Sequence, residues 1–148
     1  MIKTKEEIEI MREGGKKLAG VLAQVANLAV PGVNVSKLND EAERLIREGG
    51  DEPSFLDYTP EGAGRPYPAT LCVSINDEIV HGIPNEKDRV LKEGDIVGLD
   101  IGLKHKGLFL DTAVTVGVVE INKADQKLMN ITKEALQVGI NAARAGNT

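Results

Sequence analysis

The fold is decided by the stretch Ile96-Val-Gly-Leu-Asp-Ile-Gly-Leu-Lys-His-Lys-Gly-Leu-Phe-Leu-Asp-Thr-Ala-Val-Thr-Val-Gly-Val-Val119. Its apolar residues alternate with small or polar ones on both sides of a turn at Lys104-His105-Lys106-Gly107, which predicts a β-hairpin. The apolar residues of both strands can share one buried face only in certain registers. The tightest of these registers places Asp100 directly opposite Asp111. Small residues beside the carboxylates leave room on that face, and they are Gly98, Gly102 and Ala113.

Two carboxylates that face each other across an antiparallel pair repel, because their Cβ atoms lie only about 4.5 to 5.5 Å apart. Either one of them is protonated or a cation lies between them. Carboxylate oxygens at this spacing suit divalent metal ions, which can share such ligands. The alternative is that this face of the hairpin is simply exposed to solvent, where acidic residues are common. The flanking glycines favour a metal site.

Two helices are expected before the hairpin. Thr4 and Glu7 have the spacing of a capping box, and apolar residues then recur at helical spacing, so the first helix should run from about Lys5 to Ala29. Ser36 is a suitable N-cap for a second, shorter helix that ends at Gly49-Gly50. Both helices have one apolar face, so each should cover a sheet.

A third helix is expected after the hairpin, from about Asn122 to Arg144. Antiparallel hairpins covered by helices make an α+β protein. The chain has 148 residues, of which 41% are hydrophobic, and this suits one domain over residues 1–148 with a core of its own.

Another hairpin is expected upstream, with strands at Thr70–Ile75 and Glu78–His81 and a turn at Asn76-Asp77. This pairing would place Cys72 opposite His81. A histidine at a strand end can reach into a cleft and take part in catalysis, although an isolated histidine also fits a structural role. His105 lies between two lysines in a turn, so we expect it to be solvated.

The loop from Asp51 to Pro68 is rich in proline and glycine and also holds three of the four aromatic residues, namely Phe55, Tyr58 and Tyr67. Aromatic side chains gain little in a loop that is merely solvated, so we expect an ordered and functional loop.

Charge and composition exclude several classes of partner. The formal net charge is -5 and the basic residues form no run, which argues against nucleic acid. Cys72 is the lone cysteine, and the start of the chain lacks the apolar stretch of a signal peptide. No segment is long and apolar enough to predict a membrane span. We therefore expect a cytoplasmic protein.

Several motifs together resemble the type I methionine aminopeptidases. They are Cys72-Val-Ser-Ile-Asn-Asp-Glu-Ile-Val-His-Gly-Ile-Pro84, Leu91-Lys-Glu-Gly-Asp-Ile-Val97, Asp100 and Leu110-Asp-Thr112, and they occur in the family's order. The resemblance covers essentially the whole chain. It implies the first half of a pita-bread (creatinase/aminopeptidase) fold of metallopeptidase family M24, in which two pseudo-symmetric halves enclose a dinuclear metal centre.

The resemblance also implies an activity and a set of site residues. The activity is removal of the initiator methionine from nascent polypeptides, which the enzyme would meet at the ribosome. Asp100 would chelate one divalent ion and Asp111 would bridge two, with cobalt, manganese, iron or zinc as the metal. His81 would be the catalytic residue that hydrogen-bonds the substrate. The pocket for the methionine side chain would be lined by Tyr67, Cys72 and Phe55.

The family completes its metal site with a histidine and two glutamates from a second half, and this chain ends at Thr148, before that half would begin. One expectation is therefore the N-terminal part of a methionine aminopeptidase, inactive alone. Another is a half-size protein that is active only as a homodimer. A third is a catalytically inactive pita-bread binding module, against which the retained Asp100, Asp111 and His81 argue.

Overall fold

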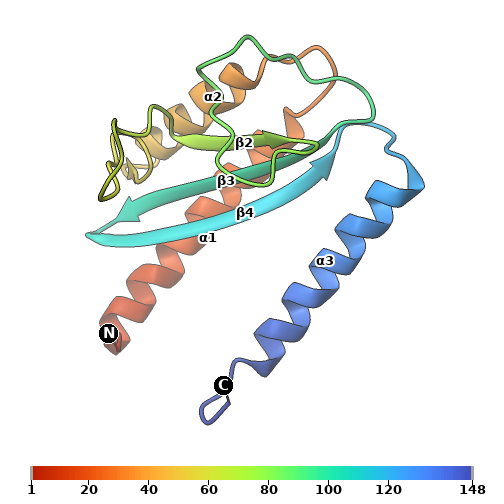
Figure 1. Ribbon diagram of the computed structural model, residues 1–148. Coiled ribbons are helices and arrows are strands. Elements are labelled where there is room, and N and C mark those ends of the chain that lie inside the picture. The colour runs from red at the N-terminus through yellow and green to blue at the C-terminus, as the bar shows by residue number, and fades with distance from the viewer. Residues whose placement is uncertain (1, 148) are drawn as a thin grey trace.

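A computed structural model describes residues 2–147 and has one antiparallel sheet with two helices packed on one of its faces (Figure 1). In chain order the elements are α1 (Lys5–Asn27), α2 (Val35–Glu48), β1 (Glu52–Pro53), β2 (Leu71–Ile75), β3 (Ile96–His105), β4 (Leu108–Gly117) and α3 (Lys123–Ala142). Strand β3 is central, with β1 and β2 along one edge and β4 along the other. The expected α+β class is confirmed.

The ends of the helices follow from side-chain caps. Thr4 and Glu7 form the expected capping box at the start of α1. The N-cap of α2 is Asn34 and not Ser36, so the prediction was wrong by two residues. The Asn34 side-chain oxygen accepts a hydrogen bond from the Ser36 amide at 3.0 Å, which satisfies one of the free N–H groups of the first turn.

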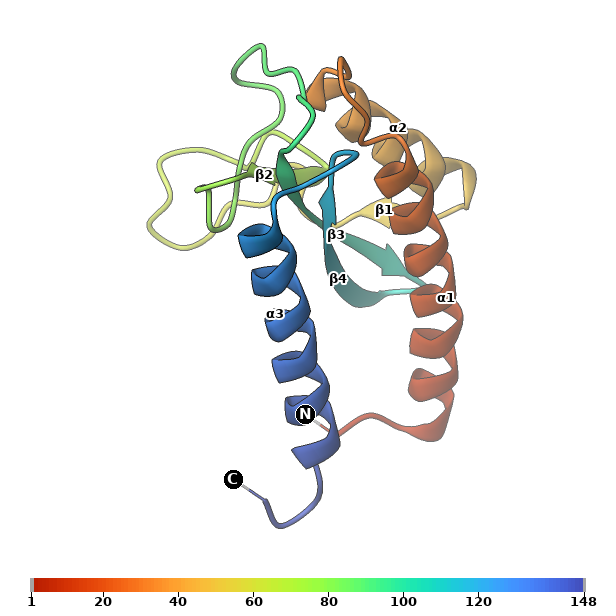
Figure 2. The same ribbon diagram turned by 90° about the vertical axis from the view of Figure 1, so that its right-hand side faces the viewer.

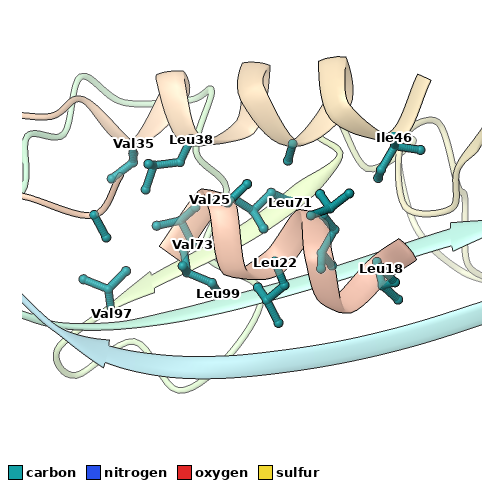
Figure 3. Packing of buried hydrophobic residues seen from close by; sticks show 14 of the residues in the cluster. Leu18, Leu22, Val25, Val35, Leu38, Ile46, Leu71, Val73, Val97 and Leu99 are labelled. Carbon is teal, nitrogen blue, oxygen red and sulfur yellow. The ribbon is translucent and has the colours of Figure 1, made fainter. Parts of the chain in front are cut away.

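The core lies between these two helices and the sheet (Figure 3). Figure 3 shows Leu18, Leu22 and Val25 of α1 facing Leu71 and Val73 of β2 and Leu99 of β3. Burying each such leucine stabilises the fold by roughly 1.5 to 3 kcal/mol. The core therefore covers one face of the sheet, and the opposite face, called the free face below, is not covered by α1 or α2.

One buried polar side chain joins α2 to the sheet. Asn39 is 3% exposed, and its side-chain oxygen accepts hydrogen bonds from the amides of Thr70 at 2.8 Å and Leu71 at 3.2 Å. These bonds fix the point at which β2 begins. They also end the long proline-rich loop, so the next residue, Cys72, has a defined place on the sheet.

The β3–β4 hairpin forms, but the predicted register was wrong by two residues. The turn is Lys106-Gly107, both with positive φ (47° and 85°), which is a two-residue hairpin turn. Consequently Asp100 lies opposite Ala113, and Asp111 lies opposite Gly102. The two-residue shift keeps the alternation of the strands, so both aspartates still share the face away from the core.

The predicted hairpin between 70–75 and 78–81 does not form. The chain leaves β2 at Asn76 (φ 55°), and His81 also has a left-handed backbone (φ 59°), which is incompatible with a pleated strand. Strand β2 pairs instead with β3, so Cys72 lies opposite Asp100 and not opposite His81.

His105 was predicted to be solvated, and this is wrong. The extra length of β3 carries it into the interior, where it is 2% exposed and its Nδ1 lies 2.6 Å from an Asp51 carboxylate oxygen. Gly14 of α1 permits this, because a Cβ built there would lie 2.9 Å from His105 Cβ. The pair joins α1, the start of the long loop and the end of β3.

Helix α3 lies apart from the core, on the opposite side of the sheet from α1 (Figures 1 and 2). None of its residues is buried, and large apolar side chains are exposed, including Leu128, Ile131 and Leu136. Within residues 2–147 no helix combines the length and the apolar character needed to cross a bilayer.

Candidate active site

The free face of the sheet is where the two aspartates lie. Along β3 the residues Val97, Leu99, Ile101 and Leu103 point into the core, so Gly98, Asp100 and Gly102 point away from it. Asp111 of β4 is a diagonal neighbour of Asp100. Diagonal residues of an antiparallel pair lie about 7 to 8 Å apart, within reach of an ion bound by both carboxylates.

The electrostatics of Asp100 show that the two carboxylates interact. Partial burial and, after it, the neighbouring Asp111 together raise the pKa of Asp100 to about 6, whereas His81 acts to lower it. Asp100 is half-buried and Asp111 is exposed. A carboxyl with these neighbours gains from any cation that replaces its proton.

Gly102 brings the long loop close to the aspartates. A Cβ built on Gly102 would lie 2.2 Å from Ser54 Oγ and 2.8 Å from the Phe55 ring, so only glycine permits this approach. Because Gly102 lies directly opposite Asp111 and two residues after Asp100 on the same face of β3, Ser54 and Phe55 are held beside the carboxylates.

Three of the predicted pocket residues are brought together on this face. The Phe55 and Tyr67 rings meet edge to face, with centroids 6.5 Å apart and planes at 88°. The Tyr67 hydroxyl lies 3.1 Å from Cys72 Sγ and 3.4 Å from the carbonyl oxygens of Leu71 and Gly82. Cys72, in turn, is the direct partner of Asp100 across β2 and β3.

These polar groups are neutral near pH 7. Burial raises the pKa of the Tyr67 hydroxyl, and the contact with Cys72 adds to this effect. Burial also raises the pKa of the Cys72 thiol; the Tyr67 hydroxyl opposes this, and the two aspartates reinforce it. An aromatic pair with an uncharged thiol forms an apolar, uncharged wall beside two carboxylates.

His81 lies on the segment that follows β2, and its side chain is exposed. The segment returns to β2 at Gly82, whose carbonyl accepts a hydrogen bond from the Val73 amide at 2.8 Å and whose amide donates to Ser74 Oγ at 3.2 Å. Gly82 is needed here, because a Cβ would lie 2.1 Å from the Val73 carbonyl oxygen. All six predicted site residues are therefore grouped around the free face of β3.

Known enzymes are similar to this chain in both sequence and fold. Residues 9–148 match the metallopeptidase family M24. The chain belongs to this family. It is 41% identical to methionine aminopeptidase 1 of Mycobacterium tuberculosis over 141 residues. The matched region covers 95% of this chain and 50% of that protein. It is also 41% identical to the methionine aminopeptidase of Aquifex aeolicus, over 97% of this chain and 55% of the relative.

Solved structures of M24 proteins have the same architecture. The methionine aminopeptidase of Thermotoga maritima superposes with a TM-score of 0.83 at 36% identity, over 93% of this chain and 52% of that one. An X-Pro aminopeptidase from the same organism, at 20% identity and a TM-score of 0.79, shares the fold alone. This confirms the pita-bread fold. The chain spans about half the length of the curated relatives that it matches.

Membership of a metallopeptidase family implies a divalent metal cofactor, and the two aspartates fit one. Both offer hard carboxylate oxygens on one face of the sheet, and the pKa of Asp100 is raised by burial and by its neighbour Asp111. Within residues 2–147, however, no group of three or more His, Cys, Asp or Glu side chains could hold an ion. In this described part of the chain, Asp100 and Asp111 are therefore a candidate pair of ligands and not part of a larger ligand group.

The residues that sequence analysis missed are those that support the predicted ones. The hydrogen bond from the Gly82 amide to Ser74 Oγ holds the segment that carries His81. Arg89 donates hydrogen bonds to Glu78 and to the Ile83 carbonyl of the same segment. An arginine and a glutamate eleven positions apart in a polar stretch give no sign of such a contact. The one available signal was the glycine directly after His81.

Proposed function

We propose that this chain is the N-terminal repeat of a methionine aminopeptidase and supplies one wall of its active site. The reaction is the metal-dependent removal of the initiator methionine from nascent polypeptides. The observation that supports this most strongly is the grouping of Asp100 and Asp111 on the free face of the sheet, beside the uncharged wall of Phe55, Tyr67 and Cys72.

In this proposal Asp100 and Asp111 hold two divalent ions, with cobalt, manganese, iron or zinc as the candidates. When bound, such ions lower the pKa of a bound water and polarise the scissile carbonyl. The two aspartates set the position of that chemistry on the sheet. Because Asp100 is a direct neighbour of Cys72, the chemistry takes place beside the uncharged wall.

The uncharged wall binds the methionine side chain. A thioether is polarisable and makes favourable contacts with aromatic rings, so the perpendicular rings of Phe55 and Tyr67 suit it. Cys72 forms the floor, since it is buried on β2 with its thiol at the Tyr67 hydroxyl. A glutamate side chain would lose its hydration here without gaining a partner, which favours methionine over glutamate.

His81 hydrogen-bonds the substrate near the scissile peptide bond. Its imidazole is exposed on the same side as the aspartates, and its charge acts on Asp100. An exposed imidazole can donate to a peptide carbonyl or accept from a peptide amide, according to its tautomer.

The proposed function is tested by hydrolysis of Met-Ala-Ser with added manganese or cobalt, using the chain extended by its downstream reading frame. We expect metal-dependent release of methionine, its loss in Asp111→Asn, and wild-type activity in the matched control Asp40→Asn on the exposed surface of α2. An extended chain without metal-dependent activity would contradict the proposal, as would a downstream frame that encodes no further histidine and glutamate ligands. Sedimentation and a Met-Ala-Ser assay of the 148-residue chain alone test the alternative of a half-size homodimer. A monomer without metal-dependent activity would rule that alternative out.

A further inference from the structure

His81 lies on a segment, residues 76–83, that contacts the sheet mainly at its two ends. At the first end, Asn76 exchanges hydrogen bonds with the backbone of Ile96 at 2.9 and 3.0 Å. At the second end, Gly82 is bonded to β2. Between them Ile79 is 91% exposed and Val80 is 62% exposed, so apolar packing does not hold the middle of the segment.

The backbone of His81 is strained. Its φ of 59° places a non-glycine residue in the left-handed region, which costs of order 1 kcal/mol and persists only where the surroundings enforce it. If the segment were free to relax, a negative φ would be favoured at His81, and the position of its imidazole would change. Something other than apolar packing must therefore hold this conformation.

Arg89 provides that restraint. Its Nη1 donates to both carboxylate oxygens of Glu78 at 2.8 and 2.6 Å, and its Nη2 donates to the carbonyls of Val73 at 3.2 Å and Ile83 at 3.0 Å. The guanidinium thus joins the segment before His81, the segment after it and strand β2. The Arg89 side chain is only 17% exposed, so these bonds are partly shielded from water.

Glu78 completes the restraint. One of its carboxylate oxygens accepts a hydrogen bond from the Ile75 amide at 2.9 Å, at the end of β2. Burial acts to raise the pKa of Glu78, but the Ile75 amide and Arg89 outweigh it and hold the pKa below its usual range. Glu78 is therefore ionised at neutral pH, and its pair with Arg89 is charge-assisted.

We propose that Arg89 and Glu78 are positioning residues for catalysis, which hold the 76–83 segment on β2 so that His81 faces the Asp100 side of the sheet. This inference rests on the proposed aminopeptidase function, because it assigns the pair a role in that reaction. Neither residue touches the substrate in this account. Each acts through the backbone on both sides of His81.

Amide hydrogen exchange on the 148-residue chain tests the restraint without any assay of activity. In Arg89→Met we expect the amides of Val73 and Gly82 to exchange at least about tenfold faster, since the hydrogen bonds they form close the segment onto β2. The amides of Thr70 and Leu71, which are bonded to Asn39, should keep their protection. Unchanged protection of Val73 and Gly82 would overturn the proposal.

Two further variants separate the restraint from general loss of charge or of folding. Glu78→Gln keeps an acceptor for the Ile75 amide and removes the ion pair with Arg89, so the variant should fold. The amides of Val73 and Gly82 should exchange faster than in the wild type, but less so than in Arg89→Met. Arg44→Met is the matched control. Like Arg89, Arg44 forms ion pairs with glutamate, here Glu41 and Glu48, but it lies on α2. It should leave the exchange of Val73 and Gly82 unchanged.

Kinetics of the chain extended by its downstream frame test the catalytic role. We expect Arg89→Met to lower kcat for Met-Ala-Ser by about ten- to a hundredfold, because a small misplacement of a catalytic group costs that much, with unchanged manganese affinity. A looser segment with an unchanged kcat would overturn the positioning role and leave the proposed function intact. An extended wild-type chain without activity would contradict the proposed function itself.

Discussion

Replacing Asp100 by asparagine should remove a pH dependence of stability that this carboxyl causes. Its pKa is about 6 in the folded chain against an ordinary value of 3.8. Between these values the folded chain binds more protons than the unfolded chain, so the free energy of unfolding falls as the pH rises through this window. A difference of about two units between the folded and unfolded pKa values corresponds to about 3 kcal/mol in the free energy of unfolding for a fully buried group. Because this carboxyl is only half-buried, solvent screening reduces the expected effect to about 1 kcal/mol.

Urea unfolding with EDTA present, at a series of pH values from 4 to 7, measures this effect. We expect the wild-type chain to lose about 1 kcal/mol more than Asp100→Asn over the window. Asp40→Asn, on the exposed surface of α2, should follow the wild type. An Asp100→Asn chain that keeps the wild-type pH dependence would refute the electrostatic account of the carboxylate pair. In a parallel series without EDTA, saturating manganese should cancel the wild-type loss, because the metal replaces the proton as the partner of the carboxylates.

Three other substitutions test the framework around the site. Asn39→Ala should lower the free energy of unfolding by about 2 kcal/mol in urea titrations, because two buried amides lose their acceptor; a change near zero would be inconsistent with this. Gly20→Ala lies in α1 with nothing within 4 Å of the added methyl group, so thermal unfolding should show a gain of about 1 kcal/mol. Gly102→Ala should displace Ser54 and Phe55 and change the near-ultraviolet circular dichroism, and an unaltered spectrum would argue against their close approach.

Much of the fold was predictable because it depends on alternation along strands and on helical spacing. The hairpin of β3 and β4 must bury Leu99, Ile101 and Leu103, and this requirement alone places Asp100 and Asp111 on the opposite face. The shift of two residues in register arose because the predicted four-residue turn over 104–107 is only two residues long, Lys106-Gly107, with Lys106 in the left-handed region. Periodicity thus predicts the face of a strand, whereas turn geometry decides which residues are opposed.

The rest could not be predicted because it depends on contacts between distant segments. The apparent strand at residues 78–81 has the right composition, but the left-handed backbone of His81 and the bonds from Arg89 give it another shape. Similarly, His105 looks solvated between its lysine neighbours until Asp51, more than fifty residues away, supplies a buried partner. The apolar residues of α3 have the spacing of a packed helix, yet they meet no counterpart within residues 2–147.

Calorimetric titration with manganese tests most directly whether Asp100 and Asp111 form one wall of a metal site. The titration compares the 148-residue chain with the chain extended by its downstream frame, each as wild type and as the variant with both aspartates replaced by asparagine. We predict weak binding to the short chain, a gain in affinity of at least about a hundredfold on extension, and loss of that gain in the double variant. Tight manganese binding by the extended double variant would contradict the account.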